Sequence, residues 1–194
     1  MSLVSLSTLR GTLISRSTVA TNLLLAFGGT GFLAAMAQLA FPIPGSPVPV
    51  TGQTLAVLLI GTAFGSQLGL ATTSLYIALG VAGLPFFTQG THGLSHVTGA
   101  TGGYLIGMVL ASYIAGALAE KKWDRKFSTV IPTMIISNGV IFICGLLWLQ
   151  HATSQSWSWT FAHGFTPFIV GEALKITIAS TSLPVVWKVI ARLK

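Results

Sequence analysis

The sequence predicts an all-α fold, an integral membrane bundle of six transmembrane helices. Only 7% of the 194 residues are charged and 52% are hydrophobic, and the mean hydropathy is +0.81. Soluble domains usually carry about 25% charged residues, so this chain could not cover a water-facing surface with polar groups. A helical span needs about 20 residues. The length therefore suits a single membrane domain with five to seven spans and short loops.

The first predicted span, residues 19–40, contains no charged residue. Small residues recur along it at helical spacing, at Ala26, Thr30 and Ala34. Such a stripe lets another helix approach closely, and it is either a docking face for a partner or ordinary packing inside the bundle. Four prolines and one glycine in residues 41–50 then exclude a regular helix and predict a stiff, extended loop.

Five further spans follow the proline-rich loop. The second, residues 53–64, rises only about 18 Å, less than the ~30 Å hydrocarbon core, so it is short or extends into residues 65–67. The third ends near residue 84. The fourth, fifth and sixth occupy residues 101–120, 129–150 and 167–187. Pro167 suits the first turn of the sixth helix, because its missing N–H donor is not needed there.

The basic residues predict the topology. Nine of the ten Lys and Arg residues lie in the N-terminal arm, the loop at 120–126 and the C-terminal tail. The loops expected on the opposite side, residues 41–52, 85–99 and 151–166, have none. The positive-inside rule therefore predicts a multi-pass protein of the cell membrane with both termini in the cytoplasm. Five or seven spans would separate the basic clusters. Because these residues flank apolar segments, the net charge of +7 does not indicate a nucleic-acid partner.

Residues 1–17 are predicted to be a cytoplasmic N-terminal arm, separate from the membrane domain at residues 18–194. The arm is rich in Ser and Thr and has no acidic residue. These features also fit an organelle transit peptide, which is the alternative. We favour an amphipathic arm that lies on the membrane surface. Its apolar residues are Leu3, Leu6, Leu9, Leu13 and Ile14.

Glu172 and Lys175 are the only ionisable residues, other than histidines, that fall inside a predicted span. An ion at bilayer depth costs about 2.5–3.5 kcal/mol even on the translocon-insertion scale. Their spacing of three places both side chains on one helix face, in the external half of the bundle. The pair either fixes helix packing by neutralising itself or forms the polar part of a solute pocket. We favour the pocket, because intramembrane ions usually mark functional sites.

Other kinds of chemistry have less support. His92 and His96 have a spacing that suits a metal on a helix, but they lie in a loop without a nearby acidic partner. Ser95 and His96 lack an orienting acid, so we predict no catalytic residue and no metal site.

The single cysteine, Cys144, excludes an internal disulfide. No G-x-x-x-x-G-K-[ST] motif for ATP is present,. An intramembrane enzyme and a helical scaffold are the alternative classes.

Four segments together resemble the BioY family. They are residues 46–55 (Ser-Pro-Val-Pro-Val-Thr-Gly-Gln-Thr-Leu), 76–86 (Tyr-Ile-Ala-Leu-Gly-Val-Ala-Gly-Leu-Pro-Phe), 99–107 (Gly-Ala-Thr-Gly-Gly-Tyr-Leu-Ile-Gly) and 167–175 (Pro-Phe-Ile-Val-Gly-Glu-Ala-Leu-Lys). The resemblance extends over residues 26–187, with the segments in order and at sensible spacing. It is the combination of segments that is specific to the family.

The resemblance implies a substrate-capture (S) component of an energy-coupling-factor (ECF) transporter for vitamin uptake. Such a protein has six helices and binds biotin, its transported ligand, near the external face; no cofactor is implied. ATP hydrolysis is the work of separate partners, two ATPase subunits and a transmembrane coupling protein, in the lipid bilayer. The same fold binding another vitamin, or acting as a solitary transporter, is the alternative.

The resemblance also implies which residues bind the ligand. Glu172 is expected to accept hydrogen bonds from the ureido donors of biotin, and Lys175 to contact an acceptor on it. The family usually has Asp where this chain has Glu172, and the extra methylene moves the carboxylate. Gln53, Gln89 and Tyr104 are further pocket candidates. For each of these three the alternative is a helix cap, a loop hydrogen bond or a helix interface.

Overall fold

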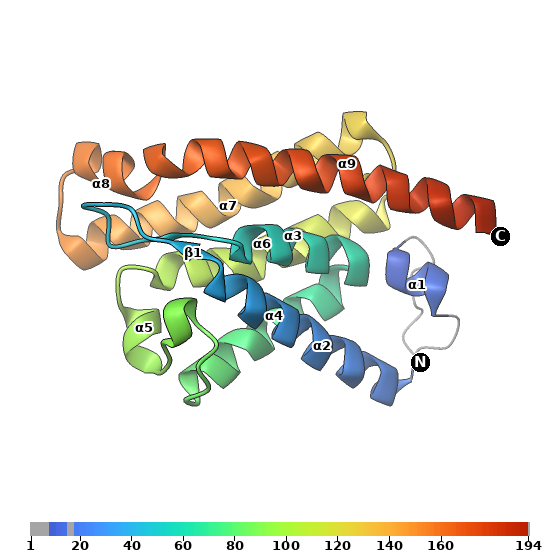
Figure 1. The fold of residues 1–194 in the computed structure, drawn as a ribbon, viewed down its shortest axis with the longest axis horizontal. Helices are drawn as coiled ribbons and strands as arrows, with labels where there is room; N and C mark the ends of the chain where they lie inside the picture. Colours follow the sequence, from blue (N-terminus) through green and yellow to red (C-terminus); the bar gives the residue numbers. More distant parts are fainter. Residues whose placement is uncertain (1–7, 15–17, 194) are drawn as a thin grey trace.

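The structure, a computed structural model, describes residues 8–14 and 18–193, and helices form most of it (Figure 1). In chain order the elements are α1 (Leu9–Leu13), α2 (Val19–Gln38), β1 (Ala40–Phe41), β2 (Val50–Thr51), α3 (Gln53–Phe64), α4 (Ser66–Val81), the 3-10 turn η1 (Thr88–Gly90), α5 (Leu94–Thr98), α6 (Gly102–Glu120), α7 (Phe127–Thr153), α8 (Trp157–Gly164), the 3-10 turn η2 (Thr166–Phe168) and α9 (Ile169–Leu193). The two strands pair antiparallel in a hairpin. The predicted helical class is therefore confirmed.

Within the described residues, four helical segments are long and apolar enough to cross a membrane. They are Val19–Gln38, Gly102–Glu120, Phe127–Thr153 and Trp157–Leu193. The helix α3 is also apolar but has only 12 residues, and α4 has 16. The membrane bundle is thus confirmed, whereas the count of six spans stays a prediction.

The elements that carry the basic residues lie at one end of the elongated bundle. Figure 1 shows α1, the start of α2, the turn between α6 and α7, and the end of α9 at the right. The β1–β2 hairpin, α5 and α8 lie at the opposite end. This arrangement brings together the segments that the charge pattern predicts on one side of the membrane.

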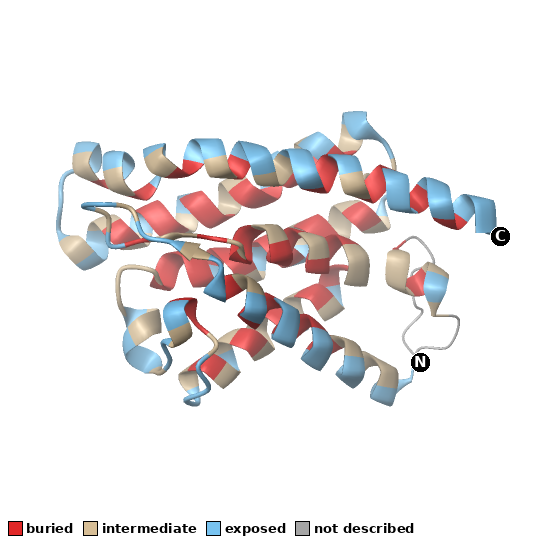
Figure 2. Cartoon of the chain, viewed as in Figure 1, coloured by how far each residue is buried: buried red, intermediate tan, exposed pale blue. Residues whose placement is uncertain are grey.

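Large apolar side chains cover the outside of the bundle, where Figure 2 shows the exposed residues on the outward helix faces. Leu24 is 75% exposed, Ile143 62% and Val170 80%. Monomeric soluble proteins rarely expose apolar patches of this extent. The hydrocarbon core of a bilayer is the environment that such a surface requires.

The helix α6 lies at the centre of the bundle and packs against α3, α4 and α7. Glycines permit two of these contacts. A Cβ atom at Gly61 would lie 2.3 Å from the carbonyl oxygen of Ser112 in α6, and one at Gly103 would lie 2.2 Å from the Cβ of Trp148 in α7. The backbones therefore approach as closely as small residues allow between membrane helices.

The small-residue stripe of α2 packs inside the bundle. Ala26, Thr30 and Ala34 are buried, and the Thr30 hydroxyl donates to the carbonyl oxygen of Thr72 in α4 at 3.1 Å. These three residues therefore serve packing inside the bundle. Gly31 and Ala35, the small residues beside them, are exposed, so a docking face there stays a prediction.

Some predicted boundaries were wrong. Pro167 does not lie in the first turn of the sixth helix; it lies in η2, and α9 begins at Ile169 and continues to Leu193. Glu172 therefore lies in the first turn of α9. The predicted loop at 151–166 contains the helix α8, which the Ser156 hydroxyl caps by accepting from the Trp159 N–H at 3.3 Å.

The described part of the N-terminal arm contains α1. Leu9 packs against the core, and Leu13 is 65% exposed. Leu3 and Leu6 lie outside the described residues, so an amphipathic surface helix over residues 1–17 stays a prediction.

A buried acid joins the turn after α6 to the far end of α9. Asp124 is fully buried, and its Oδ2 accepts a hydrogen bond from the Trp187 indole N–H at 2.6 Å. The guanidinium carbon of Arg125 lies 4.0 Å from the centroid of the same indole ring. Burial raises the pKa of Asp124 to about 6, because water no longer solvates the charged form.

This shift predicts that stability depends on pH. The folded state binds the Asp124 proton more tightly than the unfolded state, so the free energy of unfolding falls as pH rises from about 4 to 6. The difference is about 3 kcal/mol at most. We expect Asp124→Asn, which keeps an oxygen for Trp187, to raise the unfolding temperature more at pH 7 than at pH 4.5. Thermal unfolding in detergent measures this, and equal gains at both pH values would contradict it.

Candidate functional site

The polar centre of the bundle is the carboxylate of Glu172. Glu172 is only 5% exposed, so a charged side chain is buried on a helix whose other residues are mostly apolar. Lys175 lies one turn further along α9, and its ammonium forms an ion pair with Glu172 Oε1 at 2.5 Å. The spacing of three predicted this shared face.

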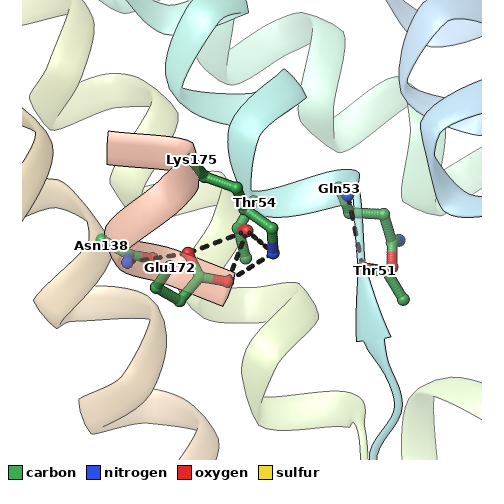
Figure 3. A network of polar contacts seen from close by, with 6 residues as sticks. All are labelled: Thr51, Gln53, Thr54, Asn138, Glu172 and Lys175. Atoms are coloured by element: carbon green, nitrogen blue, oxygen red, sulfur yellow. Dashed lines mark hydrogen bonds and ion pairs between the residues drawn. The ribbon is translucent and has the colours of Figure 1, made fainter. Parts of the chain in front are cut away.

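Two side chains from other helices complete the contacts of the carboxylate (Figure 3). The Thr54 hydroxyl of α3 lies 2.9 Å from Oε1 and 3.1 Å from Oε2, and it accepts a hydrogen bond from Lys175 Nζ at 2.9 Å. The Asn138 amide of α7 donates to Oε2 at 2.9 Å. A buried charge is tolerated when it is paired and hydrogen-bonded. Here the partners come from three different helices, so the site exists only when the bundle is packed.

A second polar cluster surrounds Gln53 at the start of α3. The Gln53 amide donates to the Tyr76 hydroxyl at 2.7 Å, and its carbonyl accepts from Thr51 at 2.9 Å and from Thr88 at 3.2 Å. Tyr76 in turn donates to the carbonyl oxygen of Phe86 at 3.1 Å. These bonds connect the hairpin, α4 and the loop that contains η1 to the beginning of α3.

Tyr104 connects α6 to the C-terminal end of α8. Its hydroxyl donates to the carbonyl oxygen of Gly164 at 2.8 Å. Its ring packs against two phenylalanines, edge-on to Phe142 and stacked on Phe168. Edge-on and offset-stacked arrangements are the favoured ones for aromatic pairs, so Tyr104, Phe142 and Phe168 together form an aromatic wall.

These groups surround a cavity of about 40 Å³. Its lining includes Gln53, Thr54, Thr88, His96, Tyr104 and Glu172. A larger, open groove of about 620 Å³ runs beside it, between α7, α8 and α9. Phe142 and Glu172 line both spaces, so they separate the small polar cavity from the apolar groove.

The structure brings most of the predicted site residues together. Glu172, Gln53 and Tyr104 line the cavity, whereas Lys175 lines neither the cavity nor the groove and joins the site through its ion pair with Glu172. Gln89 does not belong to this group. It is exposed, with a left-handed backbone (φ 58°), and the preceding residue, Thr88, lines the cavity in its place.

Thr54 and Asn138 were not predicted. Asn138 could have been noticed as an amide in the middle of an otherwise apolar span, since polar residues inside membrane helices usually face a partner. Thr54 has no such signal, because the chain contains many threonines and most of them bond to their own helix.

The histidines of the loop after α4 have different surroundings. His96 lines the cavity and its ring stacks on Phe87 at a centroid distance of 4.7 Å. Burial lowers the pKa of His96, which favours the neutral imidazole. His92 is exposed. No cluster of three or more metal-ligating side chains occurs among the described residues.

Comparison with known proteins gives consistent matches. A family model described as "BioY family" matches residues 8–192. The chain is 35% identical over 153 residues to "Biotin transporter BioY2" of Lactococcus lactis subsp. cremoris, covering 78% of this chain and 82% of that protein. It is 32% identical over 138 residues to "Biotin transporter BioY" of Thermotoga maritima, covering 71% and 80%.

The fold also has a solved counterpart. The crystal structure of the "S-component for biotin from an ECF-type ABC transporter" superposes with a TM-score of 0.79, over 89% of this chain and 95% of that one. The sequence identity is 22%, so this match establishes the fold.

The ion pair makes a prediction about stability. Lys175→Met would leave the charge of Glu172 buried without its cation, so we expect the free energy of unfolding to fall by about 3 kcal/mol. Adding Glu172→Gln removes the charge and should recover most of that loss. Lys188→Met, at an exposed lysine of the same helix, is the control. Equilibrium unfolding in mixed micelles measures all four proteins. A double variant no more stable than Lys175→Met would contradict the prediction.

Proposed function

The chain belongs to the BioY family, and from this premise we propose that it is the substrate-capture S component of a biotin importer. The observation that carries the proposal is the buried Glu172 carboxylate, paired with the half-buried Lys175 and held beside a cavity by Thr54 and Asn138. The relatives are transporters, so the chain is a transport protein and not an enzyme. Ligand capture is then the role that suits a polar site inside an apolar bundle.

The chemistry of the site matches biotin. Biotin has two ureido N–H donors, a ureido carbonyl, an apolar bicyclic body and a carboxylate on an alkyl chain. We propose that Glu172 accepts from a ureido N–H and that Lys175 contacts an oxygen of the ligand. Gln53 and Tyr104, which already bond to the chain around them, shape the wall of the pocket.

Capture requires the site to open. The cavity of about 40 Å³ has room for a few water molecules, whereas pockets for small ligands usually measure about 300–1,000 Å³. We propose that the Phe142 ring, which lines both spaces, moves to join the cavity to the groove. The polar groups of the ligand then contact Glu172, and its apolar body occupies the space that the Phe142 ring leaves.

Transport requires partners and an orientation in the membrane. We propose a coupling protein in the membrane and two ATPase subunits, since the chain has no P-loop motif of its own. We further propose six spans, α2, α3, α4, α6, α7 and α9, with both termini in the cytoplasm. The basic loop at 121–126 and the end of α9 lie at the same end of the bundle (Figure 1), as the positive-inside rule requires.

Equilibrium binding of labelled biotin to the purified protein tests the proposed ligand. We expect saturable binding at micromolar biotin that excess thiamine or riboflavin does not displace. Glu172→Ala and Lys175→Ala should each weaken binding by roughly tenfold or more, since each removes a charged hydrogen-bonding group. Displacement by thiamine or riboflavin instead would favour the same fold with another vitamin. Absence of saturable binding would refute biotin capture.

Cysteine labelling from each side of the membrane tests the topology. In a Cys144→Ala background, single cysteines replace the exposed residues Lys121 and Ser158. We expect a membrane-impermeant maleimide added outside intact cells to label the Ser158→Cys variant and to leave the Lys121→Cys variant unlabelled until the membrane is permeabilised. Labelling of both from outside would contradict the six-span arrangement.

A further inference from the structure

The amide of Asn138 has a polar atom that the site as described does not use. Asn138 is 5% exposed, and its Nδ2 donates to Glu172 Oε2 at 2.9 Å. A carboxylate only accepts hydrogen bonds, so the nitrogen must face it and the orientation of the amide is fixed. The other amide atom, Oδ1, is buried and has no hydrogen-bond partner among the residues that the structure describes.

A buried acceptor without a partner is unusual and calls for a physical explanation. Most buried polar atoms in folded proteins are hydrogen-bonded, because burial removes the bonds that water would supply. The cost is higher in a membrane, where few water molecules are available to substitute. Among the described residues, Asp124 Oδ1, Ser137 Oγ and Ser180 Oγ are also buried without a partner, but of these four residues only Asn138 lines the cavity or the groove. Its acceptor is therefore the one placed to receive a donor from outside the protein.

The surroundings of Asn138 indicate the chemistry of that donor. Asn138 and Glu172 both line the 620 Å³ groove. Apart from the indole of Trp157, the rest of its lining is apolar and consists mainly of aliphatic side chains of α7 and α9 and the rings of Phe142, Phe161 and Phe165. A ligand that fits would present an apolar body to these side chains. Its hydrogen-bond donors would meet two adjacent acceptors, an amide carbonyl and a carboxylate.

We propose that Asn138 is a ligand-binding residue, whose carbonyl oxygen accepts a hydrogen bond from one N–H of a cyclic urea while Glu172 accepts from the other. The inference rests on the proposed capture of biotin and adds a specificity-determining contact to it. A ligand without the second N–H leaves Oδ1 unpartnered in the complex. Sites built to bond a particular donor discriminate strongly against analogues that lack it.

The competing explanation is that Asn138 acts only through Glu172, by holding its carboxylate in place. The two roles differ in their dependence on the ligand. A positioning residue affects every ligand that contacts Glu172 by the same factor. A residue that contacts the ligand affects only ligands that carry the matching N–H.

The test uses biotin and two isosteric analogues, in which one or the other ureido N–H is replaced by CH2. We expect the wild-type protein to bind biotin roughly tenfold more tightly than the analogue lacking the N–H that faces Asn138, which corresponds to one hydrogen bond. In Asn138→Leu this ratio should fall to about one. Asn138→Ala, which also lacks any side-chain acceptor, should behave in the same way. Monodisperse elution and an unfolding temperature near that of the wild type establish that each variant is folded.

Ser137→Ala is the matched control, because Ser137 is a fully buried polar residue next to Asn138 on α7 that lines neither the cavity nor the groove. It should retain the wild-type ratio. If both Asn138 variants weaken biotin and the two analogues by one common factor, or leave all three unchanged, the contact is refuted and biotin capture is not. If the wild-type protein fails to bind biotin, the proposed function itself is refuted.

Discussion

The rest of the structure is arranged around one constraint, the burial of the Glu172 carboxylate in an apolar bundle. An isolated charge in such surroundings is prohibitively unfavourable, so each oxygen needs a partner. Lys175 supplies the cation from the same helix, and Thr54 supplies a hydroxyl from α3. Because the partners come from different helices, the requirement to satisfy one charge fixes how α3, α7 and α9 pack together.

The helices around this site pack very closely, and small residues make that close packing possible. Gly61 lets α3 approach α6, and Gly103 lets α6 approach α7. At the same end of the bundle as the hairpin, Gln53 bonds to side chains of the hairpin, of α4 and of the loop after α4, and Tyr104 bonds to the C-terminal end of α8. The loops are thereby attached to the helices that form the site, and the polar cavity has walls of defined shape. Rigid elements of this kind hold binding groups more accurately than free loops do.

The sequence was sufficient to predict some of these features because they are local. Charge is so rare in the spans that Glu172 and Lys175 stand out, and a separation of three residues puts them on one helix face. The partner Asn138 lies 34 residues away from Glu172, and no local pattern determines which helices adjoin. Gln89 was misplaced for a related reason, since a left-handed turn directs the loop so that Thr88 rather than Gln89 lines the cavity. The helix α8 was missed because a short amphipathic segment rich in tryptophan and phenylalanine also resembles a loop at the membrane interface.

The ion pair that holds the Glu172 carboxylate also limits the kinds of ligand that the proposed site would accept. In the structure the carboxylate already receives hydrogen bonds from Lys175, Thr54 and Asn138. A donor on a ligand must therefore add a hydrogen bond to these or replace one of them, and only the net change in free energy favours binding. A neutral urea suits this exchange, because it donates to the carboxylate without carrying a charge into the bundle. A cationic ligand would compete with Lys175 and leave an excess positive charge buried, at a cost of several kcal/mol. Under the proposed function, charge balance at Glu172 would therefore favour neutral donors, and the apolar groove beside it would favour an apolar body that carries them.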